Sequence, residues 1–211
     1  KSTLVNLIPR FYDVTDGKIT IDGKDIRNVS QHELREKLGY VPQKAVLFSG
    51  DIASNILYGN PDGSEAEMTE AATIAQATEF IEQKKKKYKS TISQGGSNVS
   101  GGQKQRLSIA RAIAKHPDIY IFDDSFSALD YKTDATLRAK LKEKTSESTV
   151  MIVAQRISTI LHADQIIVLD DGQIVGKGTH KELLKNCEAY YQIASSQLSE
   201  KELEEDLKEV E

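Results

Sequence analysis

Three short apolar runs, each followed at once by polar residues, constrain the fold of this chain more than any other feature. Residues 119–122 lead into Asp123 and Asp124, residues 150–153 into Ala154 and Gln155, and Tyr40-Val41 into Pro42 and Gln43. Short apolar runs bounded in this way are typical of buried parallel strands. Because ligands of open α/β sheets bind at the carboxyl ends of the strands, we expect these polar residues to meet in one crevice.

The composition excludes several classes of protein. At 211 residues the chain is long enough for one large domain, or for a core with a smaller lobe. No apolar run approaches the roughly 20 residues needed to cross a bilayer, and the start lacks a signal-peptide pattern, so we expect a soluble, intracellular chain. Cys187 is the only cysteine, which rules out an intrachain disulfide and favours a reducing compartment. A net charge of −4, from 28 basic and 32 acidic side chains, argues against nucleic acid as a partner.

Apolar runs alternate with helical patterns along the chain, which predicts an α/β fold. Helices are expected over residues 2–7, 31–37, 101–115 and 132–144, helical spacing over 65–83, a strand and turn over 18–23, and a hairpin over 165–175 with Asp171-Gly172 as its turn. We expect residues 1–49 and 118–197 to form the core and residues 50–117 to form an inserted helical lobe. Residues 198–211 are acidic, with Leu203, Leu207 and Val210 at helical spacing, so we expect a frayed terminal helix rather than a partner-binding one.

Lys1-Ser2-Thr3 stands at the start of an expected helix. In a P-loop the lysine reaches the β- and γ-phosphates, the next hydroxyl binds Mg²⁺, and preceding glycines cradle the phosphates at a helix N-terminus. Three residues alone are a weak signal, and the chain begins at the lysine. Either the glycines lie upstream of Lys1, or Lys1 is only a start residue.

A longer string, residues 98–112, contains Ser100 followed by two glycines and then a helical pattern. Serine is a typical helix N-cap, and a helix start presents backbone N–H groups and the positive end of its dipole to an anion. The alternative is an ordinary capped helix, which does not require this string. In full, the string resembles the signature motif, LSGGQ, of the nucleotide-binding domain of ATP-binding cassette (ABC) transporters.

Other motifs follow the order of that family and extend the resemblance from Lys1 to about Gln197. Lys1-Ser2-Thr3 resembles the end of Walker A, Gln43 the Q-loop glutamine, residues 119–124 Walker B and residues 127–130 the D-loop, while Gln155 stands at the switch position. The resemblance implies a P-loop NTPase (RecA-like) core of parallel strands with an inserted α-helical subdomain that carries the signature. Residues 8–13, 47–52 and 178–184 are similar to the exporter branch, which implies an upstream six-helix membrane domain and a place at the cytoplasmic face of the cell membrane.

The resemblance also implies a mechanism shared between two such domains, which meet head to tail with each ATP between the Walker motifs of one and the signature of the other. By resemblance, Ser2 and Asp123 hold Mg²⁺, and Gln43 contacts the metal and the attacking water. The implied nucleotide-binding residues are Lys1, Ser2, Thr3, Gln43, Ser100, Gly101, Gly102, Gln103 and Asp130. These roles are electrostatic, because positioning and charge neutralisation supply most phosphoryl-transfer catalysis.

Two positions depart from the family's pattern. Asp124 stands where a glutamate usually polarises the water, and Gln155 stands where the switch histidine is usual. The shorter carboxylate is withdrawn by about 1 Å, a misplacement that can cost about 10²-fold in rate, and an amide cannot share a proton as an imidazole can. We therefore expect slow hydrolysis at this site. The alternative is that Asp124 acts adequately through water and Gln155 is neutral variation.

The altered catalytic residues and the signature together resemble the degenerate subunit of a heterodimeric exporter, whose partner should carry Glu and His and an impaired signature. Two other functions stay open: a hydrolytically competent homodimeric exporter ATPase, and a dimerisation module that holds ATP with little catalysis. A DNA-repair ATPase is disfavoured because no long heptad segment interrupts the chain. Since the family's phosphate-loop glycines and adenine-stacking aromatic residue would precede Lys1, we expect the isolated chain to bind ATP poorly and to be inactive.

Overall fold

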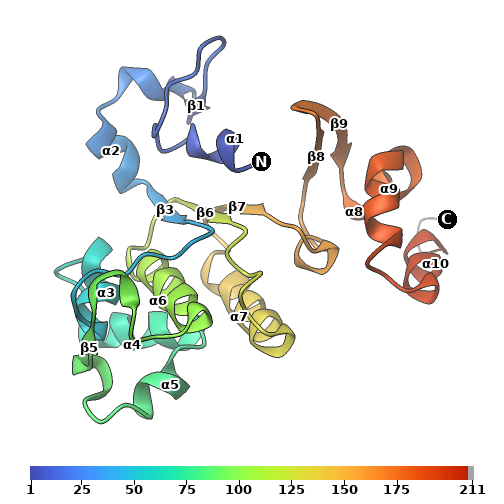
Figure 1. Cartoon of the computed structure of the whole chain (residues 1–211). Helices are drawn as coiled ribbons and strands as arrows, with labels where there is room; N and C mark the ends of the chain where they lie inside the picture. The colour runs from blue at the N-terminus through green and yellow to red at the C-terminus, as the bar shows by residue number, and fades with distance from the viewer. Residues whose placement is uncertain (209–211) are drawn as a thin grey trace. The chain divides into compact units, whose positions relative to one another are not determined.

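The computed structural model describes residues 1–208, and their contacts divide the chain into two compact units. One unit is Ser2–Val153, and the other begins at Ala154 and also includes Lys1. Figure 1 traces both along the chain by colour. The division between residues 153 and 154 falls inside the predicted core. The boundaries expected for the helical lobe, after residue 49 and after residue 117, stay a prediction.

A three-stranded parallel sheet forms the centre of the first unit. Its strands are β3 (Leu38–Val41), β6 (Ile119–Asp123) and β7 (Thr149–Val153), with β6 in the middle. These strands come from the three apolar runs of the sequence, so the predicted parallel arrangement is confirmed. The polar residues that follow β3 and β6 therefore lie at one edge of the same unit, whereas Gln155, which follows β7, belongs to the other unit.

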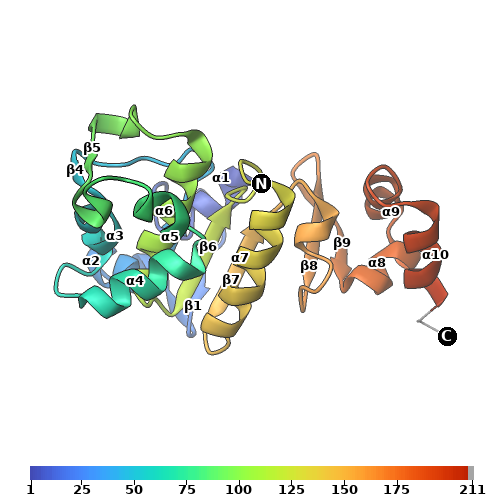
Figure 2. The same ribbon diagram turned by 90° about the horizontal axis from the view of Figure 1, so that it is seen from below.

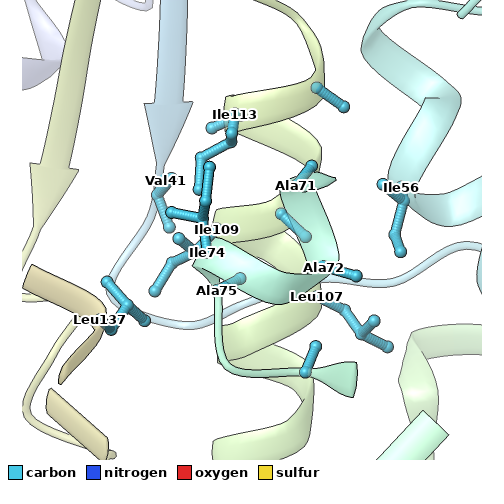
Figure 3. Close-up of a cluster of buried hydrophobic side chains, with 14 of the residues drawn as sticks. Val41, Ile56, Ala71, Ala72, Ile74, Ala75, Leu107, Ile109, Ile113 and Leu137 are labelled. Carbon is cyan, nitrogen blue, oxygen red and sulfur yellow. The ribbon is translucent and has the colours of Figure 1, made fainter. Parts of the chain in front are cut away.

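Helices cover both sides of this sheet. Figures 1 and 2 show α4 (Glu65–Ile74), α6 (Gly101–Ala114) and α7 (Tyr131–Lys144) on one side and α1 (Ser2–Asn6) on the other. The largest buried apolar cluster lies between β3, β6 and the helices α4, α6 and α7, and it includes Val41, Ile56, Ala71, Ala72, Ile74, Ala75, Leu107, Ile109, Ile113 and Leu137 (Figure 3). Burial of this much apolar surface is the main force that holds the unit together.

The segment with helical spacing over residues 65–83 forms two helices rather than one. α4 ends at Ile74, and α5 (Thr78–Glu82) begins after a turn in which Gln76 has a φ of 56°. Arg106 of α6 donates from Nη1 to the carbonyl oxygen of Gln76 at 2.7 Å, and its guanidinium lies 4.9 Å from the centre of the Phe80 ring. The break is therefore held from outside the segment, by a side chain of the signature helix.

Shorter elements complete the first unit. They are β1 (Thr20–Ile21) paired with β2 (Lys24–Asp25), α2 (Gln31–Glu36), β4 (Gly50–Asp51) paired with β5 (Thr91–Ile92), α3 (Ile52–Ile56), and the 3-10 turns η1 (Ile26–Asn28), η2 (Leu57–Gly59), η3 (Lys87–Lys89) and η4 (Gln94–Gly96). Ser30 begins α2 through a capping box with Glu33. Within η4, Gly95 and Gly96 have φ values of 66° and 67°, which glycine adopts without a steric penalty.

The second unit combines a hairpin with three helices. β8 (Ile166–Asp170) and β9 (Gln173–Gly178) pair antiparallel, and the turn residues Asp171 and Gly172 have positive φ values of 43° and 78°. Positive φ at both positions is what a two-residue type I′ hairpin turn requires, so the predicted turn is confirmed. The 3-10 turn η5 (Ile157–Thr159) precedes the hairpin. The helices α8 (His180–Asn186), α9 (Glu188–Ser195) and α10 (Glu200–Lys208) follow it.

The acidic tail is packed against the rest of its unit. Leu203 of α10 is 8% exposed and joins the apolar cluster of the second unit, against which Leu207 also packs. Val210, the third apolar residue of the predicted helix, lies outside the described residues. Asp206 Oδ2 lies 3.1 Å from Nε2 of the buried His180, whose Nδ1 is 2.8 Å from the Tyr190 hydroxyl. These contacts hold α10 at both its apolar and its polar face.

Among residues 1–208, the helices are all too short or too polar to cross a lipid bilayer.

Candidate functional site

The carboxyl end of β6 brings together two residues that are far apart in the sequence. Ser2, in the first turn of α1, donates from Oγ to Asp123 Oδ1 at 2.9 Å. Asp123 is the last residue of β6 and is 4% exposed. The hydroxyl and the carboxylate predicted to hold a metal therefore meet.

This pair of oxygens suits Mg²⁺. The ion prefers hard oxygen ligands at about 2.0–2.1 Å in octahedral geometry, in which neighbouring ligands are about 2.9 Å apart. The separation of Ser2 Oγ from Asp123 Oδ1 equals that spacing. Within the described residues no group of three or more His, Cys, Asp or Glu side chains could enclose a metal ion. A partial set fits Mg²⁺ all the same, because this ion usually takes one or two protein carboxylates and completes its shell with water and substrate phosphates.

Gln43 and Asp124 also meet, although they follow different strands. Gln43 Nε2 donates to Asp124 Oδ2 at 3.0 Å. Asp124 is 7% exposed, has a left-handed φ of 48°, and donates from its backbone N–H to the carbonyl oxygen of Val153 at 2.9 Å. The left-handed turn directly after β6 directs the carboxylate toward the segment after β3. The predicted contact of Gln43 with a metal stays a prediction, since its amide nitrogen binds Asp124 here.

Tyr40 and Asn6 are two residues of this site that the sequence analysis missed. The Tyr40 hydroxyl donates to Asn6 Oδ1 at 2.7 Å and lies 3.5 Å from Asp123 Oδ2. Burial, and after it the charge of Asp123, raises the pKa of Tyr40 to about 12, so the phenol is neutral at physiological pH. The sequence did contain a signal for Tyr40. Its hydroxyl is a polar group within an apolar strand, and that strand pairs with the strand of Asp123.

The signature residues form the start of α6. Ser100 Oγ accepts from the backbone N–H of Gln103 at 3.3 Å, and the Ser100 N–H donates to Gln103 Oε1 at 3.2 Å. This is a capping box, so the predicted N-cap at Ser100 is confirmed. Ser100 and Gly101 are exposed, and a Cβ on Gly101 would meet no atom within 4 Å. The first turn of α6 therefore presents an open face at the positive end of the helix dipole.

Asp130 has a structural partner within its own loop. Its side chain caps α7 by accepting from the Thr133 N–H at 3.0 Å. Hydrogen bonds from Thr133 hold the pKa of Asp130 below its usual value, so the carboxylate is charged at neutral pH. Just upstream, Ser127 Oγ donates to the carbonyl oxygen of Asp124 at 2.9 Å, which ties this loop to the end of β6.

Of the remaining predicted residues, two belong to the second unit and one is exposed in the first. Thr3 is exposed in α1, and Lys1 groups with the second unit. Gln155 also belongs to the second unit, where its carbonyl oxygen accepts from Gln197 Nε2 at 3.0 Å. Gln197 Oε1 accepts in turn from the Ile157 N–H at 2.8 Å, so Gln197 fixes the backbone on both sides of Arg156. The roles of Lys1, Thr3 and Gln155 stay predictions.

Several known proteins are similar to this chain in sequence. A family profile described as "ABC transporter" matches residues 1–127. An uncharacterised ABC transporter ATP-binding protein of Mycobacterium tuberculosis is 48% identical over 200 residues, which is 93% of this chain and 34% of that protein. A putative multidrug export ATP-binding/permease protein of Staphylococcus aureus is 45% identical over 197 residues, again 93% of this chain and 34% of that protein. The chain thus spans about a third of the length of the curated relatives it matches.

A solved structure gives the same result for the fold. The structure of a bacterial Atm1-family ABC exporter with ATP bound superposes with a TM-score of 0.91 at 40% sequence identity, and it covers 95% of this chain and 35% of that one. The predicted P-loop NTPase fold is therefore confirmed. By sequence and by fold, the chain belongs to the ABC transporter family.

Proposed function

We propose that this chain binds and hydrolyses ATP to power export by an ABC transporter, and that its own site hydrolyses slowly. The observation that carries the proposal is the pairing of Ser2 with Asp123 beside the pairing of Gln43 with Asp124. The first pair can hold Mg²⁺, which supplies charge neutralisation to the phosphate oxygens when bound. The second pair stands where an attacking water would be positioned. The export role rests on relatives whose names describe multidrug export and on the likeness to an ABC exporter.

Slow hydrolysis follows from the state of Asp124. Its carboxylate is one methylene shorter than that of a glutamate, is nearly buried, and accepts a hydrogen bond from Gln43. Because Gln43 Nε2 is engaged in the same contact, the two groups that would orient the water bind one another. Displacement of a catalytic group by about 1 Å can lower the rate by about 10²-fold.

The signature points to a second domain of the same kind. The open first turn of α6 presents backbone N–H groups and Ser100, a combination that suits a phosphate. It serves the nucleotide of a facing domain, and a non-identical partner with Glu and His at the two altered positions supplies the faster site. A membrane domain in the same protein would place the pair at the cytoplasmic face of the membrane.

Restoring the two usual residues tests the slow site. We expect the double variant Asp124→Glu, Gln155→His, in the protein produced from its complete reading frame, to hydrolyse ATP about 10²-fold faster than the unmodified homodimer. Asp62→Glu is the matched control, since Asp62 is exposed and distant in the sequence from every motif. Equal rates for the double variant and the unmodified protein would favour the competent homodimer instead.

A second candidate is a dimerisation module that holds ATP with little catalysis. The contact between Gln43 and Asp124 favours it, because a site with both groups engaged would retain ATP. After incubation with MgATP and removal of free nucleotide, this candidate predicts one unhydrolysed ATP per dimer. Recovery of ADP alone would exclude it.

A further inference from the structure

We propose that Tyr40 is a positioning residue for Asp123, because its hydroxyl lies within reach of Oδ2, the carboxylate oxygen that does not accept from Ser2. The inference rests on the proposed function, since it concerns how the chain orients a ligand of Mg²⁺. It adds a residue outside the motifs that the sequence analysis identified, and it assigns a role to the phenol and to Asn6.

The two oxygens of Asp123 face different groups. Oδ1 accepts from Ser2 Oγ at 2.9 Å, and Oδ2 lies 3.5 Å from the Tyr40 hydroxyl. Asp123 is 4% exposed, so water does not compensate for a missing donor, and a poorly satisfied buried carboxylate costs free energy. A donor on Oδ2 would leave the other oxygen, beside Ser2, to bind the metal.

The sheet places Tyr40 where it can reach this oxygen. Tyr40 pairs with Ile121 in the parallel register of β3 and β6, and Ile121 and Asp123 share one face because side chains alternate along a strand. The long phenol extends forward along that face to the side chain two residues further on. Phe11 packs edge-on against the ring, with centroids 5.4 Å apart and an interplanar angle of 87°, which fixes the ring.

Asn6 controls where the phenol's single proton goes. The hydroxyl donates to Asn6 Oδ1 at 2.7 Å, the length of a good O–H···O bond, whereas the distance to Asp123 Oδ2 is at the long limit. Rotation about the C–O bond redirects the proton from Asn6 to Asp123. Asn6 therefore accepts the hydrogen bond of the Tyr40 hydroxyl in one rotamer, and Asp123 accepts it in the other.

Metal affinity tests this role directly. Groups that hydrogen-bond a metal-binding carboxylate typically change metal affinity 10–100-fold when mutated, so we expect Tyr40→Phe to raise the dissociation constant for Mn²⁺ about 10-fold. Mn²⁺ stands in for Mg²⁺ and is followed by electron paramagnetic resonance, in the protein produced from its complete reading frame with a non-hydrolysable ATP analogue. Affinity for the analogue without metal should change by less than about twofold, because the phenol acts through Asp123.

Two further variants separate positioning from packing. Tyr120→Phe removes a hydroxyl from a buried tyrosine of the neighbouring strand β6 and should leave Mn²⁺ affinity unchanged. Asn6→Ala removes the competing acceptor and leaves Asp123 as the acceptor for the phenol, so Mn²⁺ affinity should rise, and weaker binding would overturn the inference. All titrations are made well below the unfolding temperature of each variant.

The outcomes distinguish this inference from the proposed function. Unchanged Mn²⁺ affinity in Tyr40→Phe, or equal weakening in Tyr40→Phe and Tyr120→Phe, would overturn the positioning role while the proposed function stands. If the unmodified protein bound no Mn²⁺ with the ATP analogue, the proposed function would fail and the inference with it.

Discussion

Gln43 Nε2 donates a 3.0 Å hydrogen bond to Asp124 Oδ2. This bond joins the segment that follows β3 to the segment that follows β6. Gln43 is exposed, while Asp124 is 7% exposed. The bond therefore links a surface segment to a buried carboxylate. It ties the segment after β3, which leads into the predicted helical lobe, to the residue that is predicted to be catalytic.

Removal of this bond should have a measurable cost in stability. We expect Gln43→Ala to lower the free energy of unfolding by about 1 kcal/mol, the net worth of a typical intramolecular hydrogen bond. Urea denaturation followed by circular dichroism measures the change. Gln83→Ala removes an exposed glutamine at the end of α5 and should change stability less. If both variants were equally stable, the Gln43–Asp124 contact would contribute nothing to the folded state.

The cap of α6 offers a second prediction with an internal control. Ser100 and Ser64 begin α6 and α4 with capping boxes of the same kind. Loss of a serine N-cap costs about 1 kcal/mol, so Ser100→Ala and Ser64→Ala should destabilise the protein by similar amounts. Under the proposed function, however, only Ser100 serves nucleotide on a facing domain. ATPase rates of the assembled pair should therefore fall with Ser100→Ala and not with Ser64→Ala, and a similar fall with both would show an effect of stability alone.

Buried tyrosines make the stability depend on pH in the alkaline range. Burial raises the pKa of Tyr120 from 10.0 to about 12. The folded state then binds the phenolic proton more tightly than the unfolded state, so this stabilising contribution is complete below pH 10 and is lost as the pH rises toward 12. Tyr190 behaves alike, with a pKa raised to about 12 chiefly by burial. The loss of stability at alkaline pH is therefore shared between Tyr120 and Tyr190.

Substitution of Tyr120 measures how much this residue contributes to the pH dependence of stability. We expect the unfolding free energy of Tyr120→Phe to fall less steeply than that of the unmodified protein between about pH 9 and about pH 11.5. Tyr131→Phe is the control, because Tyr131 is 70% exposed and should leave the slope unchanged. Urea midpoints across this range give the comparison, and parallel slopes for all three proteins would contradict it.

The sequence predicted the strand ends well because two physical rules act locally there. Apolar runs mark buried strands, and parallel strands present their carboxyl ends at one edge, so the meeting of Gln43 with Asp124 followed from the pattern. Ser100 was predictable for the same reason, since a serine N-cap depends on neighbouring residues.

Features that depend on distant contacts were not predictable in this way. The break between α4 and α5 at Gln76 is held by Arg106, which is 30 residues away in sequence. The position of Asn6 beside Tyr40 depends on how α1 packs on the sheet, and no local periodicity encodes that packing. Gln155 follows a predicted strand end, yet the chain divides into two units just before it.

The C-terminal helix gives a last prediction, because a polar contact joins it to the rest of its unit. Asp206 of α10 lies 3.1 Å from Nε2 of the buried His180. Asp206→Ala removes that contact but leaves the cap of α10 in place, in which Ser199 accepts from the Glu202 N–H at 3.3 Å. We therefore expect faster amide hydrogen exchange across residues 200–208 with little change in the hairpin of β8 and β9. Glu205→Ala is the matched control, since the pair of Glu205 with Lys201 is exposed at 3.7 Å and such pairs contribute little. Equal exchange in the two variants would show that Leu203 and Leu207 hold the helix without help from His180.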